Sequence, residues 1–79
     1  MKTKLINASL EHFRSHVIKH KMNVDVLLEN PRALHEHSDF MSAIEVELEE
    51  MAKYEDLIEV LCKFWPNETK EFVFTDYGY

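Results

Sequence analysis

Apolar residues recur at helical spacing in two long segments of the chain, residues 6–28 and residues 40–65. Steps of three and four residues place apolar side chains on one face of an α-helix, and both segments are far longer than a strand. The intervening residues 30–37 begin with Asn30-Pro31, a pair that ends helices and favours a turn. The pattern therefore predicts two antiparallel helices joined by a short turn.

We expect one all-α domain, an antiparallel two-helix hairpin resembling a coiled coil, followed by a short aromatic tail. The predicted bounds are a helix over about residues 4–29, a turn over 30–37, a helix over about 38–65 and a tail over 66–79. Thr3, Asn7 and Ser9 are alternative caps for the first helix, and Ser38 is the predicted cap of the second, with Asp39 in its first turn. Pro66 is predicted to stop the second helix.

The apolar positions of the two helices also predict how the helices pair. In the first helix they follow alternating steps of four and three, close to a heptad repeat. A turn over 30–37 pairs residues whose numbers add to about 67, which places Val17 opposite Met51. The same register places His20 opposite Glu47, the two polar residues that interrupt the apolar faces. We expect a partly buried hydrogen-bonded pair there, with a role in register more than in function.

The tail differs in character from the helices. Phe72, Val73 and Phe74 favour a strand, and Tyr77 and Tyr79 add further aromatic rings. Three arrangements remain open: the tail folds back onto the hairpin, pairs as a short strand, or docks on another protein. We expect the first.

Length and composition limit what such a chain can do. A domain of 79 residues buries a small core and is marginally stable, so a partner or a second copy would stabilise it. The single cysteine, Cys62, excludes an intrachain disulfide and fits a reducing compartment. No apolar run approaches the length that spans a membrane, and the first residues do not resemble a secretion signal. We expect a cytoplasmic protein without membrane association.

The net charge of −6 is unevenly distributed along the chain. Residues 1–30 carry five basic and three acidic side chains, whereas residues 31–79 carry four basic and twelve acidic ones. Opposite charges therefore lie side by side in an antiparallel hairpin, which favours this pairing.

Five histidines are the main candidates for chemistry. His12, His16 and His20 share one helical stripe, a spacing that can chelate zinc with a further ligand. The chain has no His-Glu-x-x-His sequence and no cysteine nearby, so we expect a solvated helix face and no metal. His35 and His37 lie at the turn, far from His12. Local sensitivity to pH between about 6 and 7 is the more credible property.

Enzymatic activity and cofactor binding find little support in the sequence. There is no glycine-rich phosphate loop, no nucleophile with a recognisable base, and a two-helix hairpin offers no enclosed cavity for a substrate. Binding of nucleic acid by the basic first helix, as in hairpin dimers of the ROP type, is disfavoured by the acidic chain as a whole. An acidic mimic of DNA stays open as an alternative, based on Glu45, Glu47, Glu49, Glu50, Glu55, Asp56 and Glu59.

About half of the chain, residues 27–61, resembles small uncharacterised helical-hairpin proteins encoded by tailed bacteriophages. The resemblance rests on Asn30-Pro31, His37-Ser38-Asp39-Phe40-Met41, Ala43-Ile44-Glu45 and Met51-Ala52-Lys53-Tyr54-Glu55. It implies a phage accessory protein that acts in the host cytoplasm by binding something larger, and it supplies no active site.

Several apolar residues lie outside the predicted contact between the two helices. With aromatic residues of the tail they form the candidate partner surface: Ile18, Met22, Val26, Val46, Val60, Phe64, Phe72, Phe74 and Tyr77. We expect a non-enzymatic factor that binds and modulates a protein partner, with dimerisation into a four-helix bundle as an open possibility. The alternatives are the DNA mimic, a ROP-like RNA-binding dimer, and a minor structural component of a virion.

Overall fold

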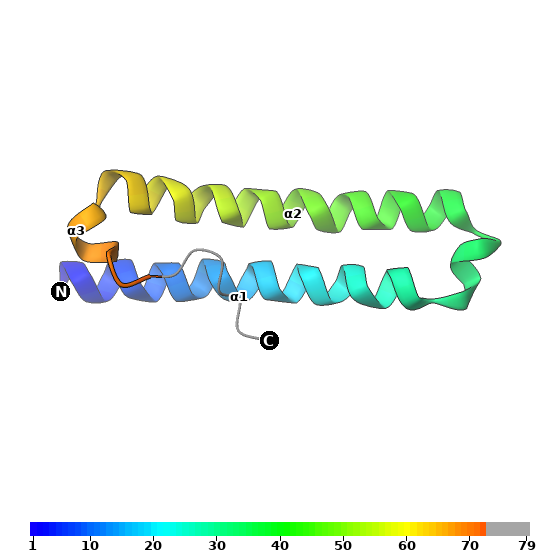
Figure 1. Ribbon diagram of the computed structural model, residues 1–79, viewed down its shortest axis with the longest axis horizontal. Helices are drawn as coiled ribbons and strands as arrows, with labels where there is room; N and C mark the ends of the chain where they lie inside the picture. The colour runs from blue at the N-terminus through cyan, green and yellow to red at the C-terminus, as the bar shows by residue number, and fades with distance from the viewer. Residues whose placement is uncertain (73–79) are drawn as a thin grey trace.

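The computed structural model describes residues 1–72, and all of their regular structure is helical. Two long helices, α1 (Lys2–Glu29) and α2 (His37–Phe64), run antiparallel and side by side (Figure 1). A 3₁₀-helix, η1 (Pro31–Leu34), lies in the turn between them, and a short helix, α3 (Pro66–Thr69), lies at the opposite end. The molecule is elongated, with extents of 51 × 20 × 17 Å.

Asn30 and Pro31 determine where α1 ends. Asn30 is extended, with φ −73° and ψ 124°, as the residue before a proline prefers, and its side-chain Oδ1 accepts a 3.0 Å hydrogen bond from the backbone N–H of Arg32. Pro31 then occupies the first position of η1, where no backbone donor is needed. An ion pair of 2.9 Å between Arg32 and Glu36 closes the turn before α2 begins.

The predicted caps of the long helices are wrong. α1 begins at Lys2 after Met1, and α2 begins at His37 after Glu36, and neither preceding side chain caps its helix. Ser38 lies inside the first turn of α2 because the Glu36 carbonyl already accepts the backbone N–H of Phe40 at 3.1 Å. Asp39 does lie in this first turn, where its carboxylate complements the helix dipole.

The core is one layer of side chains between α1 and α2. Among the described residues, four hydrophobic side chains are buried: Ile6, Leu10, Val17 and Ile58. Partly buried side chains surround them, namely Phe13, Met51, Tyr54, Leu61, Cys62 and Phe72. Three of the buried four lie in the half of the hairpin that carries the N-terminus and α3, so burial is deepest there.

A short helix after α2 was not anticipated. Pro66 ends α2 at Phe64 but also starts α3, because a proline fits the first turn of a helix. The chain crosses the end of the hairpin toward α1 (Figure 1), where Glu68 lies 3.4 Å from the Lys2 ammonium. Thr69 is buried and its hydroxyl donates to the carbonyl of Trp65 at 2.9 Å.

Phe72 follows α3 and packs against the core. Its backbone N–H donates to the carbonyl of Thr69 at 2.9 Å. The remaining tail, which includes Phe74 and Tyr77, lies outside the described residues, so its arrangement stays a prediction. None of the helices in residues 1–72 combines the length and apolar character that crossing a bilayer requires.

Candidate functional site

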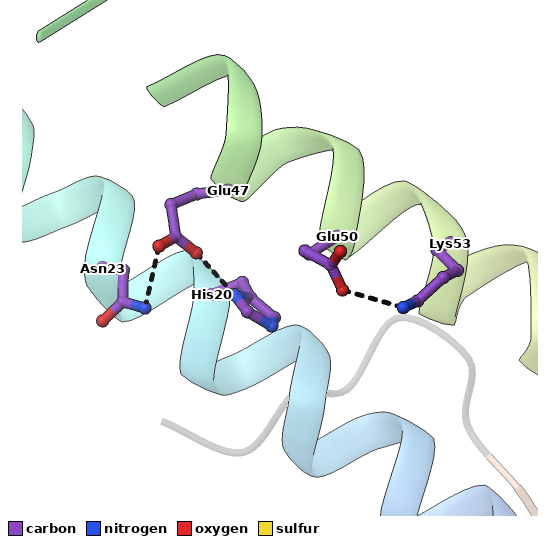
Figure 2. Close-up of polar contacts among 5 residues, drawn as sticks. All are labelled: His20, Asn23, Glu47, Glu50 and Lys53. Carbon is purple, nitrogen blue, oxygen red and sulfur yellow. Dashed lines mark hydrogen bonds and ion pairs between the residues drawn. The ribbon is translucent and has the colours of Figure 1, made fainter. Parts of the chain in front are cut away.

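A polar cluster joins the middle of the two long helices. The Glu47 side chain points from α2 toward α1, where it meets His20 and Asn23 (Figure 2). One carboxylate oxygen lies 2.5 Å from Nδ1 of His20, and the other accepts a 3.2 Å hydrogen bond from the Asn23 amide. The structure therefore brings together the two residues that the sequence register pairs, and adds Asn23, which the sequence analysis missed.

The carboxylate of Glu47 is held in its charged form. The hydrogen bond from His20 is the main reason that the pKa of Glu47 lies below its ordinary value, and the hydrogen bond from Asn23 acts in the same direction against the cost of desolvation. Its side chain is 22% exposed and that of His20 is 12% exposed. A partly buried charge that accepts one hydrogen bond on each oxygen favours a single register of α1 against α2.

A stack of aromatic rings continues this cluster toward the N-terminus. The rings of His16 and Tyr54 are nearly parallel, with centroids 4.2 Å apart and an interplanar angle of 9°. The His20 ring lies 6.1 Å from His16 and 6.3 Å from Tyr54, nearly parallel to Tyr54, and His12 meets His16 edge-on at 4.7 Å. His16 is therefore packed between the helices, whereas the sequence pattern predicted a solvated histidine stripe; His12 is the exposed member.

His16 carries a buried nitrogen without a hydrogen-bond partner, its Nδ1. Desolvation is the main cause that lowers the pKa of His16. The positive charges that His12, Lys19 and His20 of α1 and Lys53 of α2 carry when protonated act in the same direction. The folded protein therefore favours the neutral form of this imidazole.

We expect this histidine to make the fold less stable in mild acid. Because its pKa is lowered by folding, the unfolded chain binds more protons than the folded one, and stability falls as pH drops through the ordinary histidine value of about 6.5. The melting temperature of the wild type should decrease between pH 7.5 and about pH 5.5, and His16→Phe should flatten this dependence. Thermal melts by circular dichroism at several pH values measure it.

A control for this prediction is His37→Phe, in the exposed first turn of α2. It should keep the pH dependence of the wild type. If His16→Phe and His37→Phe change the pH dependence equally, the assignment to His16 is wrong.

Glu50 and Lys53 form an ion pair on α2 next to the polar cluster (Figure 2). Their charged atoms lie 2.9 Å apart, and the hydrogen bond between them lowers the pKa of Glu50 and raises that of Lys53. The ammonium of Lys53 also lies 4.7 Å from the centre of the Tyr54 ring. Within residues 1–72, no three histidine, cysteine, aspartate or glutamate side chains converge in a group that could hold a metal ion.

The predicted partner surface divides into exposed and packed residues. Met22, Val26, Val46, Val60 and Phe64 are exposed, and so is Leu57 of α2. Ile18 is only half-buried, and Phe72 belongs to the core contacts instead of an outward surface. Phe74 and Tyr77 lie outside the described residues.

Four exposed side chains of α2 follow helical spacing and form what we call the outer stripe. They are Val46, Leu57, Val60 and Phe64, with exposed fractions of 59%, 39%, 43% and 63%. Steps of three, four and seven residues place the last three on one side of α2, and Val46 lies on the same side two heptads before Val60. Exposed apolar residues are normally scattered singly, so four of them on one side of a helix suggest a contact surface.

The outer stripe lies on the broad face opposite to α3. Phe72, together with Thr3, Asn7 and Arg14 of α1, lines a cavity on the other face. Each broad face of an antiparallel pair is made of one side of α1 and one side of α2. The face with the cavity carries Asn7 and Arg14 of α1 and Leu48 and Cys62 of α2. The opposite face carries Leu5 and Val26 of α1 next to the outer stripe of α2. The segment after α2 thus covers the face with the cavity, near the N-terminal end of α1. The described residues leave the face with the outer stripe uncovered, and we call it the open face.

Comparison with known protein families, with curated proteins and with solved structures finds no match to this chain. The site therefore has to be interpreted from its own geometry. That geometry consists of a polar cluster between the helices and an apolar surface outside them.

Proposed function

We propose that the protein is a non-enzymatic binding factor and that the outer stripe receives a helix of a protein partner. The observation that carries this proposal is the exposure of four large apolar side chains at helical spacing on the open broad face. An amphipathic helix binds such a surface by inserting its own apolar residues at positions i, i+3, i+4 and i+7. The resemblance to phage accessory proteins is in keeping with this role.

The charges around the outer stripe define the chemistry of the partner. Glu49 and Asp56 are exposed on α2. Glu49 follows Val46 by three residues and Asp56 precedes Val60 by four, so both border the stripe on its outer side. α2 as a whole carries eight acidic and two basic side chains. A helix with basic flanks would therefore be attracted and an acidic one repelled. A basic helix of a DNA-binding protein belongs to this class, which is how the DNA-mimic alternative would act.

The test uses Trp65, the single tryptophan, which is 39% exposed and contacts the Phe64 ring edge-on at 6.4 Å. Two amphipathic peptides with the same leucine pattern, one with lysine flanks and one with glutamate flanks, are titrated while tryptophan emission is recorded. We expect the basic peptide to bind at least about tenfold more tightly, and its affinity to fall with added salt.

A matched pair of variants locates the binding surface. Val60→Asp, in the outer stripe, should abolish the change in emission, whereas Leu48→Asp, on the other face with a similar exposed fraction of 49%, should preserve it. Binding that is equal for both peptides, or equally lost in both variants, contradicts the proposal. A response to an RNA or DNA duplex in place of the peptide would favour the nucleic-acid alternative.

A further inference from the structure

We propose that the helix received by the outer stripe is α1 of a second copy of this chain. Two hairpins then stack through their open faces into a four-helix bundle whose two-fold axis runs parallel to the helices. This inference rests on the proposed function and names the partner.

The shape of the molecule supports a second layer. Stable domains are built from at least two packed layers, and this hairpin is a single layer with four buried hydrophobic side chains in its described part. The molecule is 51 Å long, so a second hairpin laid along this face can contact it over several helical turns. Because α3 and Phe72 lie against the other face, the open face is the one available to a second copy.

The charges of the helices select the direction of the two-fold axis. α1 carries five basic and three acidic side chains, whereas α2 carries two basic and eight acidic ones. An axis parallel to the helices places each α1 on the α2 of the other copy, so unlike charges meet. An axis across the helices would place the two acidic α2 helices on each other, which costs electrostatic energy.

The register within one hairpin predicts which residues meet between copies. On the open face, the contacts His16 with Tyr54 and Asn23 with Glu47 join residues whose numbers add to 70. The parallel axis keeps this level relationship between copies, because both turns lie at the same end. Residues whose numbers add to about 70 then lie level between the copies. Leu5 is level with Phe64 of the second copy, Lys19 with Glu50, and Val26 lies between the levels of Ala43 and Val46.

This arrangement forms two apolar layers separated by a charged layer. Leu5 and Val26 are exposed in one hairpin, with exposed fractions of 60% and 67%, so each provides apolar area for the dimer to bury. Lys19 forms the central layer with Glu50, which in its own hairpin is paired with Lys53. A charged layer between apolar ones favours one register over shifted alternatives.

Sedimentation velocity of the full chain under reducing conditions tests the dimer. We expect twice the monomer mass over a concentration series up to about 1 mM. Val60→Asp should weaken dimerisation by at least about tenfold, and Leu48→Asp should leave it unchanged. Circular dichroism of both variants is the control for folding. A monomer throughout the series, or equal weakening by both variants, overturns the inference.

A charge exchange tests the direction of the axis. Lys19→Glu and Glu50→Lys should each weaken the dimer, and the double variant should recover most of the loss, because the exchanged charges again attract. A double variant that is no better than the two single losses combined rules out the parallel axis.

The outcomes separate this inference from the proposed function. A strict monomer that still binds the basic peptide overturns the self-association alone. A monomer that binds neither peptide overturns both.

Discussion

Replacing Ile58 with alanine is expected to destabilise the hairpin by about 2–5 kcal/mol, the range found when a large buried aliphatic side chain is truncated. Ile58 is fully buried, and it is the one hydrophobic side chain that α2 contributes to the four buried ones of the described chain. Ile6, Leu10 and Val17 of α1 belong to the same buried cluster, which loses packing when Ile58 is truncated. The single layer has few neighbours that can move in to fill the cavity.

The expected loss is large relative to the total free energy of unfolding of the protein. Proteins have about 0.05–0.15 kcal/mol of stability per residue, which is roughly 4–12 kcal/mol for a chain of 79 residues. Small domains lie at the low end of this range. The variant should therefore melt at least about 8 °C lower than the wild type, or be unfolded at room temperature.

Urea denaturation followed by circular dichroism at one fixed protein concentration measures this effect, since a dimer would make stability depend on concentration. Leu48→Ala, at an exposed position of the same helix, is the matched control and should change stability by less than about 0.5 kcal/mol. Similar losses in both variants would mean that the core is not where the structure places it.

The two long helices and their pairing follow from the sequence because both depend on periodic burial. Apolar residues at steps of three and four have to face a common partner, and within one chain the short turn leaves the other helix as that partner. The position of His20 opposite Glu47 follows from the same count of residues from the turn. Each pair of facing residues that fits this register supports the same alignment of the two helices.

The helix ends and α3 depend on finer effects. Ser38 has the chemistry of a cap, yet backbone hydrogen bonding already begins at the Glu36 carbonyl. Pro66 has two roles, the end of one helix and the start of another, and the sequence pattern alone indicates the first. α3 forms where Thr69 is buried and Glu68 meets Lys2, contacts between residues at opposite ends of the described chain.

The ring stack of His16 could not be derived from periodicity. His16 lies at the edge of the apolar face, where a histidine turns either toward solvent or toward the neighbouring helix. The decision depends on Tyr54, whose flat ring lies within 4.2 Å of the imidazole. Likewise, the pattern indicated that some apolar residues face outward, but which broad face stays open depends on the side taken by α3 and Phe72.

Replacing Glu47 with glutamine should cost about 1.5–3 kcal/mol at neutral pH, the range for hydrogen bonds that involve a charged group. Glutamine keeps the shape of the side chain, but it loses the charge and presents an amide donor to His20 or Asn23, which are themselves placed to donate. Glu49→Gln, at an exposed position of α2, is the control and should have little effect. A double-mutant cycle with His20→Gln should give a coupling of at least about 1 kcal/mol.

The pH dependence of this cost identifies the carboxylate as its source. Because folding lowers the pKa of Glu47, its contribution is complete above the ordinary glutamate value of about 4.3 and is lost as pH falls through the lower folded value. The difference in unfolding free energy between the wild type and Glu47→Gln should therefore be constant from about pH 7 to pH 5 and shrink below about pH 4. Urea denaturation at each pH measures it. A difference that stays unchanged in acid would show that the side chain acts through its shape, and that the charge of Glu47 does not hold α1 and α2 in register.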